Sequence, residues 1–309
     1  MTPQKYRLIT RSDFDGLVCA VLLNEMELID EIKFVHPKDI QDGKIDVGPQ
    51  DITTNLPYVP GAYLAFDHHL SETIRNGKHR NHLIEVDALS AARGVYNQYG
   101  AKQAYPPITD QMMGAVDKAD SAQYDRADIL DPSGWVLLNY LMDARTGLGR
   151  SRGFRISNYA LMMDLIEYCR DHTIDQILAL PDVQERVDLY FAHAEPARDQ
   201  IKRCATVHGN LVVLDLRGED TIFATDRFMI YALFPECNIS IHVLWGVQKQ
   251  NTVMACGKSI LDRGSKTNVG ELMLTYGGGG HLAAGTCQIA NDAADVTLGA
   301  LIKRTTAHG

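Results

Sequence analysis

Residues 7–28 read RLITRSDFDGLVCAVLLNEMEL, and this stretch decides the fold. A short β-like run, Arg7–Thr10, leads into the acidic loop Arg11–Gly16. The loop is followed by Leu17–Leu28, whose apolar residues are typical of a buried helix. The order of strand, acidic loop and helix predicts an α/β unit.

The same pattern recurs further along the chain. Ile32–Val35 and Ala62–Phe66 are two more predicted strands, and Leu89–Gln98 is a predicted helix. Strands that alternate with helices favour a parallel sheet covered on both faces. The fold class expected for the N-terminal half is therefore α/β, with a parallel sheet and helices on both faces.

The length of 309 residues indicates two domains. Residues 158–206 are helix-like, and β-rich stretches interrupted by helices follow from Asn210 onward. We predict a first domain over residues 1–185, a helical connector over 186–206 and a smaller α/β domain over 207–309.

Composition and charge limit the classes of function. Apolar residues make up 45% and charged residues 22% of the chain, which is close to the average of globular proteins. The net charge of −9 argues against coating of long duplex nucleic acid, because such binding needs many Lys and Arg contacts with phosphates. A short anionic substrate is compatible, since metal ions and a few local cations supply positive charge.

The six cysteines are scattered without a C-x-x-C pair, so neither a zinc site nor a disulfide framework is predicted. No run approaches the roughly 18 apolar residues of a membrane span, and no signal-like apolar region follows Met1–Tyr6. The expected location is the cytoplasm.

Two acidic motifs come directly after predicted strands. Asp13 and Asp15 flank one residue on a turn closed by Gly16, which suits either a hard cation or the N-cap of a helix. Asp67-His68-His69 ends an apolar run, where two imidazoles and a carboxylate indicate a bound ligand. Because ligands collect beyond the carboxyl ends of parallel strands, we expect both motifs to form one metal site.

Two further motifs carry polar chemistry. Asp117 and Asp120 form another acidic pair, although either is compatible with an ordinary surface salt bridge. Gly277–Gly280 and His281 could turn backbone N–H groups toward a phosphate, whereas flexible linkers also use glycine. The small residues Ala283–Gly285 suit close packing at the start of a second helix, which favours the phosphate site.

Taken in order, D-x-D-G at residues 13–16, D-H-H at 67–69, an aspartate at 120 and G-G-G-H-x-A-A-G at 278–285 resemble the DHH phosphoesterases with a C-terminal DHHA1 domain. The resemblance covers nearly the whole chain. It points to the branch related to exopolyphosphatases and to nanoRNA and linear-dinucleotide phosphodiesterases.

The resemblance implies one or two Mn²⁺, Mg²⁺ or Co²⁺ ions and a hydrolytic reaction. It implies the metal ligands Asp13, Asp15, His68 and Asp120, and the catalytic residues Asp67 and His69. The substrate would be held by Gly278, Gly279, Gly280 and His281, with Lys258 and Arg263 as further cations.

Two positions depart from the family pattern. A histidine common in the family before the first motif is replaced by Ile9 or, in the nearer register, by Arg11. Asn55 stands where the family has an aspartate that bridges two ions, and Asp51 is the nearest acidic residue. We therefore expect Asp51 to supply the missing carboxylate, and the alternatives are a centre with only one tightly bound ion or a chain that has lost ordinary catalysis.

The expected function is metal-dependent hydrolysis of phosphodiester bonds in short oligonucleotides, dinucleotides or nucleotide phosphates. An exopolyphosphatase ranks second, because such an enzyme needs a run of cationic residues along which a long polyanion can bind. The sequence has no evident run of this kind. A nucleotide-binding regulatory protein with a degenerate metal site is the third. A homodimer is compatible with the sequence, and no membrane partner is expected.

Overall fold

The computed structural model describes residues 4–69, 72, 76–106 and 109–307. It forms two compact units. The first contains the chain up to Gln123, Ser133–Ala144 and Gly149–Asp188, and the second contains Tyr124–Pro132, Arg145–Leu148 and the chain from Leu189. The segments 124–132 and 145–148 thus lie in the second unit, although the sequence places them within 1–185. One reason is that α6 (Arg126–Leu130) packs against α11 (Met229–Leu233).

The first unit is built on a parallel sheet of five strands in the order β2-β1-β3-β4-β5. The strands are β1 (Tyr6–Arg11), β2 (Ile29–Val35), β3 (Asp51–Thr54), β4 (Leu64–Asp67) and β5 (His82–Ile84). The parallel α/β sheet predicted from the sequence is confirmed. The strands β3 and β5 were not predicted.

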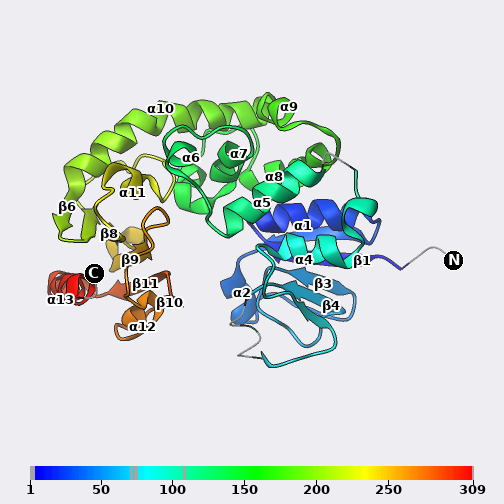
Figure 1. The fold of residues 1–309 in the computed structure, drawn as a ribbon, viewed down its shortest axis with the longest axis horizontal. Coiled ribbons are helices and arrows are strands. Elements are labelled where there is room, and N and C mark those ends of the chain that lie inside the picture. Colours follow the sequence, from blue (N-terminus) through cyan, green and yellow to red (C-terminus); the bar gives the residue numbers. More distant parts are fainter. Residues whose placement is uncertain (1–3, 70–71, 73–75, 107–108, 308–309) are drawn as a thin grey trace. The chain divides into compact units, whose positions relative to one another are not determined.

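Helices cover this sheet as expected for a parallel sheet. On one face, α1 (Phe14–Glu25) packs against α4 (Ala91–Gln98), α5 (Thr109–Asp120) and α8 (Asn158–Asp171). Figure 1 shows α2 (Pro37–Gln41) on the opposite side of the sheet from α1 and α4. A small apolar cluster of Ile9, Val35, Ile40 and Leu56 fills the space under α2.

Further helices complete the α-helical part of the chain. They are α7 (Gly134–Met142), α9 (Ile174–Leu178) and α10 (Pro181–Cys204). The predicted connector at 186–206 largely coincides with α10, which begins at Pro181 and continues through Pro196.

The second unit is built on a mixed sheet of six strands in the order β10-β11-β9-β8-β7-β6. The strands are β6 (Ala205–His208), β7 (Leu211–Asp215), β8 (Ile239–Trp245), β9 (Thr252–Lys258), β10 (Gly279–His281) and β11 (Ala284–Ile289). Only β7 and β8 pair in parallel among the described strands of this sheet.

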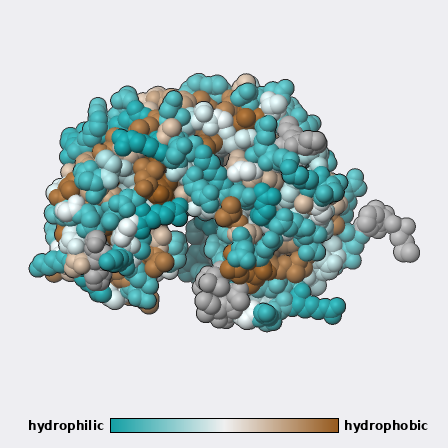
Figure 2. Space-filling view, viewed as in Figure 1, coloured by the Kyte–Doolittle hydropathy of each residue, from teal (hydrophilic) through white to brown (hydrophobic). Residues whose placement is uncertain are grey.

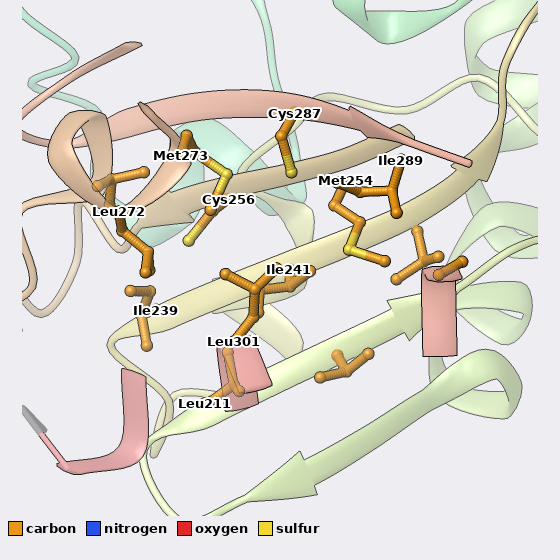
Figure 3. Close-up of a cluster of buried hydrophobic side chains, with 14 residues drawn as sticks. Leu211, Ile239, Ile241, Met254, Cys256, Leu272, Met273, Cys287, Ile289 and Leu301 are labelled. Carbon is orange, nitrogen blue, oxygen red and sulfur yellow. The ribbon is translucent and has the colours of Figure 1, made fainter. Parts of the chain in front are cut away.

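One face of this second sheet packs on α12 (Val269–Leu274) and α13 (Ala294–Ala307). Figure 3 shows strand residues such as Ile241, Met254 and Cys256 pointing toward helix residues such as Leu272 and Leu301. The other face contacts α11, where the Tyr231 hydroxyl donates to the Gly257 carbonyl oxygen at 2.7 Å. Each unit therefore has its own apolar core.

Hydrophilic side chains predominate on the face of the molecule drawn in Figure 2, with smaller hydrophobic patches between them. Within the described residues, no helix has both the length and the apolar composition that crossing a bilayer requires.

Candidate metal centre

The carboxyl ends of three neighbouring strands carry the predicted motifs. Asp13 lies two residues beyond β1, Asn55 directly follows β3, and Asp67 is the last residue of β4. Because β1, β3 and β4 are adjacent and parallel, these residues meet at one edge of the sheet. Asp120, the last residue of α5, reaches the same edge.

Three side chains form a compact set of donors. One ligand atom from each of Asp15, His68 and Asp120 lies within 4.8 Å of the others. His68 Nε2 is 2.9 Å from Asp120 Oδ2, yet this buried nitrogen has no partner with hydrogen-bond geometry. The ring's other nitrogen, Nδ1, lies 3.4 Å from the Ala88 carbonyl oxygen.

These contacts fit a divalent cation. An Nδ1–H that donates to a backbone carbonyl leaves the lone pair on Nε2, which is the arrangement of metal-binding histidines. One imidazole and two carboxylates suit a borderline or hard cation such as Mn²⁺. The predicted ligands Asp15, His68 and Asp120 thus come together, and the donor set fits the ion.

The N-terminus of α4 holds Asp15 in place. Its two carboxylate oxygens accept hydrogen bonds from the backbone N–H groups of Ala91 at 3.0 Å and Ala92 at 2.8 Å. Asp15 is buried, and burial raises its pKa well above the usual range, with the charges of Asp120 and Asp13 acting in the same direction. Backbone donors fix the carboxylate, while its acidic neighbours favour a cation beside it.

Burial alone would lower the pKa of His68, but neighbouring carboxylates outweigh it. Asp120 contributes most, followed by Asp15 and Asp67, and the pKa of His68 rises to about 9. A proton on the imidazole therefore partly neutralises this acidic edge when no cation is bound. A metal ion would have to displace that proton.

Asp67 orients His69 instead of joining the three-donor set. Its Oδ1 accepts from the backbone N–H of His68 at 2.7 Å and of His69 at 3.1 Å, and lies 2.6 Å from His69 Nδ1. The His69 side chain is 44% exposed, whereas that of Asp67 is 2% exposed. The buried Asp67 carboxylate thus holds the His69 imidazole in place, and the imidazole is accessible at the end of the strand.

Asp13 is brought to the edge but not into the three-donor set. It is the N-cap of α1, where its Oδ1 accepts from the Gly16 N–H at 3.0 Å. Its Oδ2 lies 2.7 Å from Arg11 Nε, and Asn55 Nδ2 lies 3.5 Å from Oδ1. The N-cap alternative therefore holds for Asp13, with a guanidinium beside it.

The expectation that Asp51 supplies a bridging carboxylate is wrong. Asp51 begins β3, so it lies at the amino end of the strand, three residues or roughly 10 Å from Thr54. There it forms an ion pair with Arg7, with Nε–Oδ1 at 2.7 Å and Nη2–Oδ2 at 2.9 Å. The residue at the centre is Asn55 itself, buried and with a positive φ of 53°.

Asp117 has a structural role near the centre. It accepts from the Ser90 hydroxyl at 2.8 Å and from Arg93, with Nε–Oδ2 at 2.9 Å. Ser90 is the N-cap of α4, so Asp117 steadies the helix start that holds Asp15. No motif in the sequence links Asp117 to Asp15, and the connection appears once α4 and α5 pack together.

In the second unit, the glycine segment forms a hairpin of β10 and β11, not the start of a helix as expected. A Cβ on Gly278 would lie 2.2 Å from the Thr286 carbonyl oxygen, and a Cβ on Gly280 would lie 2.3 Å from that of Ala284. Gly278 and Gly280 are thus needed for close contact between the two strands, whereas Gly279 has open space around its Cβ position.

The other predicted substrate contacts lie in the same unit. His281 ends β10 and is exposed, and its Nδ1 accepts from the Ala283 N–H at 3.3 Å. The Lys258 ammonium donates to the Ser265 carbonyl oxygen at 3.0 Å, and Arg263 is exposed. Substrate contacts of these residues stay a prediction.

Fold and centre together define a metal-binding hydrolase with a parallel α/β domain and a smaller mixed α/β domain. Among solved structures, the pGpG-specific phosphodiesterase PggH from Vibrio cholerae is 60% identical, with a TM-score of 0.88 over 99% of this chain and 100% of that chain. The chain belongs to the DHH/DHHA1 family of phosphoesterases.

Two remoter structures also match. CDC45 from Entamoeba histolytica is 9% identical, with a TM-score of 0.50 over 98% of this chain and 95% of that chain, and it shares the fold. The exonuclease RecJ bound to manganese is 13% identical, with a TM-score of 0.49 over 99% and 91%. No family model and no curated protein matches the chain.

Proposed function

We propose that this chain hydrolyses pGpG and related linear dinucleotides to mononucleotides, with a divalent cation held by Asp15, His68 and Asp120. One observation carries the proposal. The three-donor set occurs in a chain that is 60% identical, over its whole length, to a pGpG-specific phosphodiesterase. The preferred ion is proposed to be Mn²⁺, because one imidazole beside two carboxylates suits a borderline cation.

The residues of the centre have distinct tasks. A bound divalent cation would supply positive charge for phosphoryl oxygens and lower the pKa of a coordinated water. The backbone N–H groups of Ala91 and Ala92 fix Asp15, and the Ala88 carbonyl oxygen lies beside Nδ1 of His68, which leaves Nε2 to face an ion once the ring has lost its proton. These contacts organise the donors before an ion or substrate arrives.

His69 is proposed to donate a proton to the leaving group or a hydrogen bond to a phosphate oxygen. Its Nδ1 is directed at Asp67, so its Nε2 is the nitrogen available to substrate. A fixed carboxylate behind an exposed imidazole keeps the ring in one orientation. The imidazole can then donate to a phosphate oxygen or to the leaving group.

The hairpin of the second unit is proposed to bind a substrate phosphate. Gly279 and His281 are exposed on β10, which is the edge strand of its sheet. Backbone N–H groups without a side chain above them allow an anion to approach closely, and His281 adds an imidazole. Arg263 is the exposed cation proposed to assist.

The proposal is tested by measuring hydrolysis with Mn²⁺, Mg²⁺ or Co²⁺ after removal of metal. The substrates are pGpG, another linear dinucleotide, 3′-phosphoadenosine phosphate, a cyclic dinucleotide and polyphosphate, and the products are separated by chromatography. We expect GMP from pGpG, with the highest rate in Mn²⁺.

Two variants make the test specific to the centre. His68→Ala should lose activity and Mn²⁺ binding while its circular dichroism spectrum stays unchanged. His172→Ala removes an exposed histidine that pairs with Asp171 outside the centre, and it should behave as the parent. Polyphosphate cleavage without dinucleotide cleavage would instead support the exopolyphosphatase alternative.

A further inference from the structure

Arg11 sits at the centre as a built-in positive charge. It is the last residue of β1, and its Nε lies 2.7 Å from Asp13 Oδ2. Its side chain is 33% exposed, so the guanidinium is partly open to solvent. Within the described part of the chain, its terminal nitrogens Nη1 and Nη2 have no hydrogen-bond partner.

Arg7, near the other end of β1, is an arginine with a structural role and serves as a comparison for Arg11. Its Nε and Nη2 bind both oxygens of Asp51, and Nη2 also donates to the Asp46 carbonyl oxygen at 3.0 Å. The donors of Arg7 are thus largely used within the fold. Arg11 keeps the corresponding edge of its guanidinium available.

Asp13 is poorly placed to bind a cation of its own. One oxygen lies beside Arg11, and the other accepts the N-cap hydrogen bond of α1. Its neighbour Asn55 offers a buried Oδ1 without a hydrogen-bond partner but no negative charge. A second dication at this position would face a guanidinium and find one carboxylate that is already paired.

The donor sets also favour a single ion. Among the residues that the structure describes, two groups could hold a cation, one with Asp15, His68 and Asp120 and one with Asp67, His68 and His69. Both groups contain His68, whose Nδ1 lies against a carbonyl oxygen and whose Nε2 alone remains. One nitrogen lone pair binds one ion, so the two groups compete.

We infer that Arg11 takes the place of a second cation: the centre binds one divalent ion per chain, and the free edge of the Arg11 guanidinium binds a phosphate oxygen of the substrate. The inference rests on the proposed phosphodiesterase function. A planar guanidinium matches two oxygens of a phosphate, and Asp13 holds it in orientation through Nε.

The test uses the full chain and two binding measurements. Equilibrium dialysis with Mn²⁺, read by elemental analysis, gives the number of ions per chain. Calorimetry with inorganic phosphate and with GMP, on the Mn²⁺-loaded protein, gives anion affinity. We expect one Mn²⁺ in the parent and in Arg11→Met, and a loss of phosphate and GMP affinity of about 10-fold or more in Arg11→Met.

Three further variants separate charge, geometry and folding. Arg11→Lys should recover part of the anion affinity, because it restores charge without the planar fork. Arg7→Met removes a comparable ion pair at the far end of β1 and should change neither measurement. The double variant Arg11→His with Asn55→Asp removes the guanidinium and adds a carboxylate, and we expect it to bind a second Mn²⁺.

Each outcome decides between the inference and the proposed function. Two tightly bound Mn²⁺ ions in the parent, or unchanged anion affinity in Arg11→Met, would overturn the inference even if pGpG is hydrolysed. One Mn²⁺ with the expected loss of anion affinity, but no hydrolysis of pGpG, would uphold it and overturn the proposed substrate. A parent that binds no Mn²⁺ would overturn both.

Discussion

Removing the ionisable group of His68 should change how the stability of the metal-free protein depends on pH. The pKa of His68 is raised from 6.5 to about 9 in the folded chain. A raised pKa means that the folded state binds the proton more tightly than the unfolded state. The resulting stabilisation is therefore complete below pH 6.5 and is lost as the pH rises through about 9.

The size of this effect follows from the two pKa values. At about 1.4 kcal/mol for each pH unit between 6.5 and about 9, the contribution of His68 is about 3–4 kcal/mol, as an upper bound. The His68 side chain is 13% exposed, so solvent screening reduces this value only modestly. The parent should thus lose up to this amount between pH 6 and pH 10 relative to His68→Gln.

The assay is urea denaturation in the presence of a chelator at several pH values from 6 to 10. His68→Gln is compared with the parent at each pH, so that other titrating groups cancel in the difference. Equal pH dependence in the two proteins would refute the reasoning. With Mn²⁺ present the parent should respond in the opposite sense, because the ion requires the neutral imidazole and binds more tightly as the pH rises.

The other predictions concern residues around the two candidate binding regions. Asp51→Asn should weaken the ion pair with Arg7 and lower the free energy of unfolding by about 1–2 kcal/mol, while Mn²⁺ stoichiometry and turnover stay unchanged. Loss of the ion in this variant would show that Asp51 is a metal ligand after all. Gly278→Ala should lower the melting temperature of the second unit, because the new Cβ would lie 2.2 Å from a carbonyl oxygen across the hairpin. Gly279→Ala has open space for its Cβ, so it should fold normally and raise KM. Equal melting temperatures for the two variants would contradict this prediction. Asp117→Ala should cost about 3 kcal/mol of stability and weaken Mn²⁺ binding, because it releases the start of α4 that holds Asp15; unaltered Mn²⁺ affinity would show that α4 keeps its position without this contact.

The parallel sheet could be predicted because apolar runs mark its strands and helices locally. The strand β3 could not, since Asp51, Thr53 and Thr54 are polar and read as a loop. Burial of this strand depends on partners far away in the chain: the Thr54 hydroxyl donates to that of Thr10 at 2.6 Å, across 44 residues. Polar residues form a central strand here because the fold supplies their hydrogen bonds.

The metal centre was predictable in its main residues and not in its electrostatics. The spacing of D-x-D-G and D-H-H locates Asp15 and His68, because both motifs follow strands of one sheet. In the sequence, Arg11 and Asn55 can be recognised only as departures from the family pattern. Their actual contacts with Asp13 depend on how β1 and β3 align, which no local pattern specifies.

The hydrogen bonds that hold Asp15 have a consequence for the order of folding. Asp15 and its donor Ala91 are 76 residues apart, and the centre also needs Asp120 from a later helix. Closing loops of this length is slow compared with forming a helix or a turn. The donor set therefore comes together only after the strands and α4 have assembled, so the cation can stabilise a finished domain but cannot nucleate it. A nascent chain that has emerged only as far as His69 contains both named motifs and should still be unable to hold the ion.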